Sequence, residues 1–278
     1  MSATRPHTRV WSLGLLCALA AGPAQAQPLT PERVANINIT QQLGEQLPLD
    51  LRFVDETGQE VVLQQYFGSK PIILVLAYYE CPMLCTQVLN GLVKGIRPLS
   101  FDIGQEFDIV TVSIDPGETP EMARAKQQIY LDNYTGSIGN HDPVAAAAGW
   151  HFLTGTQDQI DRLTQAVGFN YEYDPDTDQY MHASGLIVLT PAGQMARYFY
   201  GIDYAPKELK WGLIEAANHT IGSPVDQLLL LCYQYDPLSG RYGLVIRNAL
   251  RVGGGATLLV LATFVITMLR RERRQTAA

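Results

Sequence analysis

Two cysteines and one histidine are the residues of this chain best suited to chemistry. Cys81 and Cys85 form a C-x-x-x-C pair directly after the apolar run 71–79, and His182 lies far downstream beside another apolar run. Two thiolates and one imidazole suit copper, as Cu(I) or, with the imidazole, as Cu(II). Structural zinc sites normally take four protein ligands, and only three stand out here. The pattern therefore predicts a copper site.

The spacing of the two cysteines also allows a disulfide. If Cys81 caps a helix whose first residue is Pro82, Cys85 falls in the first helical turn and on the same face. Cβ atoms four residues apart on a helix are about 5–6 Å from one another, near the about 3.5–4.5 Å of a disulfide. The positive end of the helix should lower the pKa of both thiols. We expect a pair that binds a metal or forms a redox disulfide, with a purely structural disulfide as the alternative.

The choice of histidine and the role of a further cysteine are less constrained. His141, His151 and His219 are rivals of His182, and spacing alone does not choose among them. Cys232 could belong to an extra ligand loop, but it is expected to be buried and inert, because a buried free cysteine behaves as a small hydrophobic side chain.

The elements that must position these residues predict an α/β domain over 46–220. Apolar runs and turn signals predict strands at 51–54, 61–63, 72–79, 107–114, 150–153, 185–189 and 195–199, and helices beginning near 82, 119, 156 and 206. This order is typical of a thioredoxin-like fold. The thiols would then sit at the carboxyl end of a buried strand, where sites form in open α/β sheets.

Both ends of the chain predict export and membrane attachment. Residues 1–26 read as a signal peptide, with a basic start, a short apolar stretch and the A-x-A site 24–26; an uncleaved anchor is the alternative. A flexible lead-in, 27–45, precedes the domain. After the domain, a C-terminal extension, 221–251, leads to the uncharged segment 252–269.

The segment 252–269 predicts a single transmembrane helix, because it is apolar and four arginines follow it within the tail 270–278. Basic residues prefer the cytoplasmic side, so the main domain would face the periplasm of a bacterial inner membrane. That compartment is oxidising, which permits disulfides. The whole chain carries a net charge of −7, and the exported segment is more acidic still because the basic ends lie outside it. An acidic surface repels nucleic acid, so nucleic acid is not an expected partner.

Several motifs in order resemble the Sco/SenC proteins, which are copper chaperones of cytochrome c oxidase assembly. The motifs are Cys81-Pro82-x-x-Cys85, Ser113-Ile114-Asp115-Pro116, Trp150-x-Phe152-Leu153-Thr154-Gly155 and His182-Ala183-Ser184, within a resemblance covering residues 45–220. The resemblance implies Cys81, Cys85 and His182 as copper ligands on a thioredoxin-like fold. It also implies oxidase subunit II as the recipient of the copper.

Three positions depart from the pattern of that family. Met181 precedes the histidine where aspartate is frequent, which leaves Asp176 and Asp178 as the nearby carboxylates; Thr86 replaces a frequent proline; and the anchor is C-terminal rather than N-terminal. The alternative function is a thiol-disulfide oxidoreductase that reduces target cysteines before they receive metal, although the redox spacing is usually C-x-x-C. Peroxidase chemistry ranks last, because no threonine and arginine accompany Cys81.

Overall fold

The computed structural model describes residues 37–81, 84–136 and 141–221, the short strands 235–236 and 241–242, and isolated positions from 251 to 266. The predicted signal peptide, Cys232 and most of the predicted transmembrane segment 252–269 lie outside the described residues. Within the described part, no helix combines the length and the apolar character that crossing a membrane requires.

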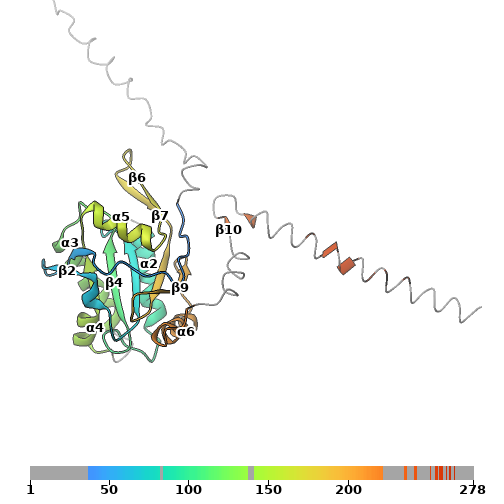
Figure 1. The fold of residues 1–278 in the computed structure, drawn as a ribbon, viewed down its shortest axis with the longest axis horizontal. Helices are drawn as coiled ribbons and strands as arrows, with labels where there is room; N and C mark the ends of the chain where they lie inside the picture. Colours follow the sequence, from blue (N-terminus) through green and yellow to red (C-terminus); the bar gives the residue numbers. More distant parts are fainter. Residues whose placement is uncertain are drawn as a thin grey trace, which may run out of the picture.

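A five-stranded mixed sheet in the order β5-β4-β3-β8-β9 forms the centre of the domain (Figure 1). Its strands are β3 (Ile72–Ala77), β4 (Asp108–Ser113), β5 (Trp150–Leu153), β8 (Gly185–Leu189) and β9 (Met195–Tyr200). β3, β4 and β5 are parallel. β8 pairs antiparallel with β3, and β9 pairs antiparallel with β8 to form a hairpin. β3, which precedes the cysteines, is the central strand and is buried at all its positions, as its unbroken apolar sequence predicts.

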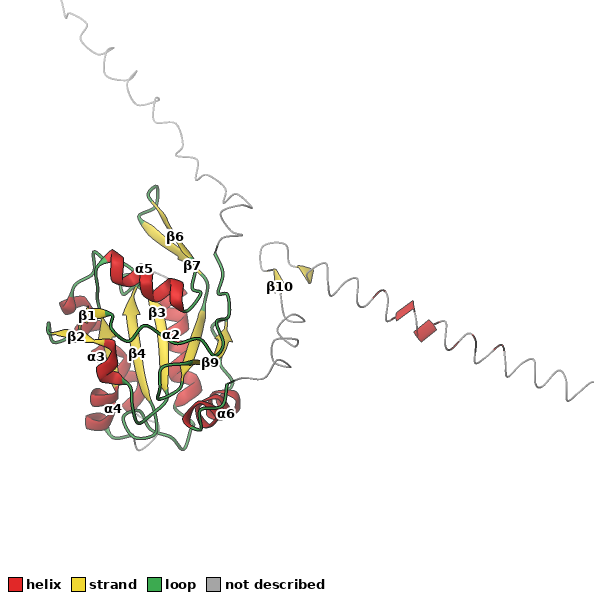
Figure 2. Cartoon of the chain, in the orientation of Figure 1, coloured by secondary structure: helices red, strands yellow, loops and turns green. Residues whose placement is uncertain are grey.

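Helices cover both faces of this sheet (Figure 2). The helices are α2 (Leu84–Ile96), α3 (Pro120–Thr135), α4 (Pro143–Gly149), α5 (Gln157–Ala166) and α6 (Pro206–Ala217). Residues of α2, α3, α4 and α6 pack in one apolar core, and α5 packs in the other with the N-terminal hairpin. That hairpin consists of β1 (Arg52–Val54) and β2 (Glu60–Val62), followed by the 3-10 helix η1 (Leu63–Tyr66).

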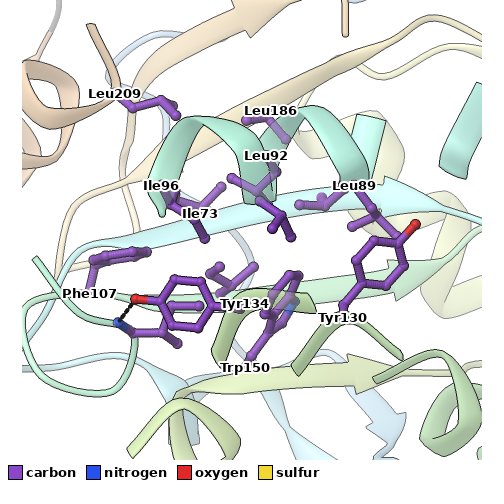
Figure 3. Packing of buried hydrophobic residues seen from close by; sticks show 14 of the residues in the cluster. Ile73, Leu89, Leu92, Ile96, Phe107, Tyr130, Tyr134, Trp150, Leu186 and Leu209 are labelled. Carbon is purple, nitrogen blue, oxygen red and sulfur yellow. Dashed lines mark hydrogen bonds between the residues drawn. The ribbon is translucent and has the colours of Figure 1, made fainter. Parts of the chain in front are cut away.

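The apolar core that contains residues of α2, α3, α4 and α6 holds α2 against the sheet (Figure 3). Leu89, Leu92 and Ile96 lie on one face of α2 and contact the same cluster as Ile73 of β3. Their spacing of three and four residues places them on a single helical stripe. Fully burying one such side chain contributes about 1.5–3 kcal/mol. The helix that carries Cys85 is thus held by its own apolar stripe.

The α/β architecture predicted from the sequence is confirmed, with differences at the element ends. β3 ends at Ala77 rather than at residue 79, and the helix that carries Cys85 is described from Leu84, because residues 82 and 83 lie outside the described residues. The sequence did not predict α4, nor a separate hairpin of β6 (Tyr171–Asp174) and β7 (Gln179–His182) that projects past one end of the sheet (Figure 1). This hairpin is the more consequential omission, because His182 is its last residue.

Glu56, in the turn between β1 and β2, is a buried acidic residue remote from the cysteines. It is 7% exposed, and its carboxylate accepts hydrogen bonds from the Phe152 amide at 3.0 Å and from Gln127 at 3.1 Å. Burial works to raise the pKa of Glu56, but hydrogen bonds from His151 and the Phe152 amide outweigh it and hold the pKa below 4.5. This carboxylate ties the N-terminal hairpin to β5 and α3.

A Glu56→Gln variant is expected to be less stable than the wild type, with a pH dependence of definite sign. A carboxyl with a lowered folded pKa contributes stability above its unfolded value of 4.5, and this contribution is lost as the pH falls through the folded pKa. The difference in unfolding free energy between the two proteins should therefore be constant at neutral pH and shrink below about pH 4.5. Urea unfolding at several pH values measures it, and a difference that grows in acid would contradict the assignment.

Candidate metal centre

Cys81 and Cys85 lie where the central strand β3 passes into α2. β3 ends at Ala77, residues 78–81 form the connecting turn, and Cys85 is the second residue of the described helix. The Cys85 amide donates to Cys81 Sγ at 3.3 Å, and the Tyr78 amide donates to Cys85 Sγ at 3.4 Å. The first sulfur thus accepts from an amide of the first helical turn, which otherwise lacks an intrahelical acceptor.

His182 approaches from the β6–β7 hairpin. β7 pairs antiparallel with β6, with His182 opposite Tyr171 in the register. Three residues further on, Gly185 starts β8, which pairs with β3. The tertiary pairing of β8 with β3 therefore brings residue 182 beside the turn that carries the cysteines.

The three predicted ligands converge in one buried group. One sulfur from Cys81, one from Cys85 and one ring nitrogen of His182 all lie within 4.8 Å of one another, and each residue is buried. Among the described residues, this is the group of three or more cysteine, histidine or carboxylate side chains that could hold a metal ion. Neither Cys81 nor Cys85 is in a disulfide, so the structure represents the reduced pair.

The hydrogen bonds of His182 select the tautomer suited to a metal. Nδ1 lies 2.8 Å from the Ala183 carbonyl oxygen, which only accepts, so Nδ1 carries the proton. Nε2 is then unprotonated, and it lies 2.9 Å from Cys85 Sγ, whose thiol donates to it. A lone pair directed at the thiols, with a backbone carbonyl behind the ring, is the arrangement of a metal-binding histidine.

The predicted lowering of the thiol pKa is wrong for Cys85. Burial raises the pKa of the Cys85 thiol well above its ordinary value of 9.0, and the neighbouring Cys81 sulfur raises it further. The free energy by which a helix N-terminus stabilises an anion is smaller than the free energy that burying the anion costs. Formation of the thiolate here requires a compensating positive charge in the site.

Aromatic side chains surround the imidazole. The rings of Phe169 and Tyr78 lie 5.8 Å and 6.1 Å from that of His182, and the Tyr180 ring lies 5.7 Å from that of Tyr78. Burial raises the pKa of Tyr180 to about 12, so its phenol is neutral at physiological pH. These rings limit the access of water to the three ligand atoms.

The rival histidines serve other parts of the fold. His141 contacts Asp102 and stacks on Tyr134. The His151 ring lies 4.5 Å from the Tyr66 ring, at a tilt, and beside Glu56. His219 is exposed after α6. The nearby carboxylates also lie outside the cluster, since Asp178 accepts from the Tyr173 hydroxyl and the Asp176 amide donates to Asp174.

Sequence reasoning did not identify the β6–β7 hairpin that presents the histidine. Its signal is present as alternating aromatic residues on both sides of Asp174-Pro175-Asp176-Thr177, a turn-forming run. Glu118, a buried carboxylate beside the cysteine turn, was also missed. No local pattern distinguishes Glu118 from an ordinary acidic residue at a helix start.

Known proteins resemble this chain in sequence and structure. A protein from Stutzerimonas stutzeri, named for copper binding, is 24% identical over 149 residues, which are 52% of this chain and 65% of that protein. This chain thus spans a little under two thirds of that relative's length. A crystal structure from Aquifex aeolicus VF5, titled as an electron transfer protein, shares 28% identity and a TM-score of 0.54, over 64% of this chain and 95% of that one. The copper-bound ScoI of Arabidopsis thaliana is 18% identical, with a TM-score of 0.48, over 61% and 96%.

The family profile described as SCO1/SenC matches residues 40–210. The matched region contains the central sheet, the cysteine turn and the β6–β7 hairpin. It extends over more than half of the chain, and this chain therefore belongs to the SCO1/SenC family.

Proposed function

We propose that this chain is a copper chaperone that holds copper through Cys81, Cys85 and His182. The observation that carries the proposal is the buried convergence of two sulfurs and one unprotonated imidazole nitrogen within 4.8 Å. A metal–thiolate bond is about 2.3 Å long for zinc, so sulfurs up to about 4.6 Å apart can share one ion of similar size. Thiolate and imidazole ligands suit copper, and the relative from Stutzerimonas stutzeri is named for copper binding.

Copper is the cargo in this proposal. Binding replaces the two thiol protons, and the positive ion supplies the charge that the raised pKa of buried Cys85 requires. His182 offers Nε2 without losing a proton, because its proton is on Nδ1. The ligands come from two separate segments, the cysteine turn and the β6–β7 hairpin, so separating the segments would reduce the ligand number and favour release.

The recipient and the location belong to the same proposal. We infer delivery to the exported copper site of cytochrome c oxidase subunit II, as the family resemblance implies. The apolar segment 252–269 and the arginines after it would anchor the chain in a bacterial inner membrane, with the copper site in the periplasm. Protease treatment of intact spheroplasts should digest the domain that carries Cys81 and spare the C-terminal tail.

Copper loading of the wild type and of His182→Ala tests this function against the oxidoreductase alternative. The reduced full-length chain, purified in detergent, is expected to bind one copper per molecule and to pass it to the soluble domain of subunit II. His182→Ala should lose Cu(II) binding, keep weaker Cu(I) binding through the two thiolates, and fail to support oxidase assembly in cells. Copper analysis, absorption spectra and oxidase activity measure these results.

A matched control is His219→Asn, which alters an exposed histidine with a positive φ of 55° that asparagine tolerates. This variant should load and transfer copper normally. A wild-type chain that binds no copper would overturn the proposal. A His182→Ala chain that retains thiol exchange and full oxidase assembly would favour the oxidoreductase.

A further inference from the structure

One peptide group in the cysteine turn is held by two oppositely charged side chains. The amide of Glu80 donates to the Glu118 carboxylate at 2.7 Å, and the Lys126 ammonium donates to the carbonyl of Tyr79 at 2.8 Å. This carbonyl and this amide belong to the same peptide unit, between Tyr79 and Glu80. One further peptide unit, between Glu80 and Cys81, follows it, so the orientation of the held unit affects the direction in which the chain enters Cys81.

Contacts outside the cysteine turn also hold Glu118 in place. It is 7% exposed, and its second oxygen accepts from the Ser113 hydroxyl at 2.5 Å. Its own amide donates to the Asp115 carbonyl at 3.3 Å, which closes the turn between β4 and α3. A buried carboxylate with both oxygens hydrogen-bonded is rigid and costly to disturb. It is therefore a defined anchor rather than a solvated surface charge.

These two contacts restrict rotation of the peptide unit between Tyr79 and Glu80. The turn 78–81 lies outside the sheet ladder, which ends at Ala77, and its internal hydrogen bond, from the Cys81 amide to the Tyr78 carbonyl, is long at 3.4 Å. Rotation of the unit between Tyr79 and Glu80 would move its carbonyl and amide and redirect Cys81. Hydrogen bonds to charged groups are stronger than those between neutral groups, so the two contacts favour one orientation.

The turn that carries Glu118 also lies against the histidine hairpin. The Tyr180 hydroxyl is 3.5 Å from the Asp115 carboxylate, and Tyr180 is two residues from His182 on the same strand. Residues two apart on a strand share a face. One short turn, 115–118, therefore contacts both segments that supply ligand atoms.

We propose that Glu118 and Lys126 form a peptide clamp that positions Cys81 relative to Cys85 and His182. The proposal rests on the proposed copper site and adds two positioning residues that do not touch the metal. Outer contacts that orient ligands typically change metal affinity about 10–100-fold when removed. The clamp also sets the geometry of the two thiols in the reduced protein, and it therefore affects the equilibrium between dithiol and disulfide.

The experiment compares Glu118→Ala, Glu118→Gln and Lys126→Met with the matched variant Glu56→Gln. Glu56 and Glu118 are both 7% exposed and both accept from a backbone amide, but the amide bonded to Glu56 belongs to Phe152, in β5. Cu(I) affinity is measured by competition with a chromophoric chelator, and unfolding by urea. The reduction potential of the cysteine pair is measured against dithiothreitol buffers, which requires no copper.

Glu118→Ala is expected to weaken Cu(I) binding about 10-fold or more and to shift the reduction potential. Glu118→Gln should have a smaller effect, since its amide oxygen can still accept from Glu80. Lys126→Met should resemble Glu118→Ala, and Lys126→Arg should restore binding. Glu56→Gln should lose stability while keeping both copper affinity and potential.

Two results would contradict the proposal that Glu118 and Lys126 position Cys81. One is an unchanged affinity and potential in Glu118→Ala and Lys126→Met. The other is an equal change in Glu56→Gln, which would mean that lost stability alone is responsible. A wild-type chain that binds no copper would contradict the proposed function and not the clamp. The reduction potentials of the same variants would then still test whether Glu118 and Lys126 position Cys81.

Discussion

Replacing Cys85 with serine is expected to lower the Cu(I) affinity of the chain more than about 100-fold, because removal of an outer contact alone costs about 10–100-fold. Cys85 is fully buried, and its sulfur lies within 2.9 Å of His182 Nε2. A serine hydroxyl is a hard, neutral ligand that Cu(I) does not favour. Cys81→Ser should have a similar effect, since its sulfur completes the same group. Chelator competition on the reduced, full-length protein measures both affinities.

The matched control is Cys232→Ser, which removes a thiol that the sequence predicts to be inert. Copper stoichiometry and affinity should be unchanged in this variant. Circular dichroism should show that all three variants keep their folded structure, because serine is slightly smaller than cysteine and leaves little void. Full copper loading in both Cys81→Ser and Cys85→Ser would refute the assigned ligands.

Replacing Gly91 with alanine is expected to reduce the free energy of unfolding by about 2 kcal/mol or more. A Cβ at this position of α2 would lie 1.9 Å from the backbone oxygen of Ile202, in the loop between β9 and α6. A backbone carbonyl cannot rotate away like a side chain, so the helix or the loop must shift. Overpacking costs about 1–3 kcal/mol or more, and the gain of about 1 kcal/mol in helix propensity offsets only part of it.

Asn90→Ala is the neighbouring control for this substitution. Asn90 is exposed on the same helix, and alanine there should leave stability unchanged or raise it slightly through helix propensity. Urea unfolding of both variants gives the comparison. A Gly91→Ala protein as stable as Asn90→Ala would mean that the loop after β9 does not approach α2 as closely as the structure places it.

The elements next to the thiols could be predicted from local sequence patterns. Val75 and Leu76 belong to an unbroken apolar run, which only a strand buried on both faces explains, and the strand β3 follows. Val88, Leu92 and Ile96 repeat at helical spacing, and α2 buries that stripe. Local periodicity carries this information because strands and helices repeat every two and every 3.6 residues, whatever surrounds them.

The histidine that joins the cysteines, and the charge state that the thiols prefer, could not be predicted without the folded structure. His182 reaches Cys85 because β8 pairs with β3, and a contact between residues nearly a hundred positions apart has no local signature. The raised pKa of Cys85 depends on how deeply the domain buries it, and the hold of Glu118 on Glu80 depends on packing of the turn after β4 beside the turn after β3. Burial and long-range contact are properties of the assembled fold, whereas sequence spacing encodes only neighbours along one element.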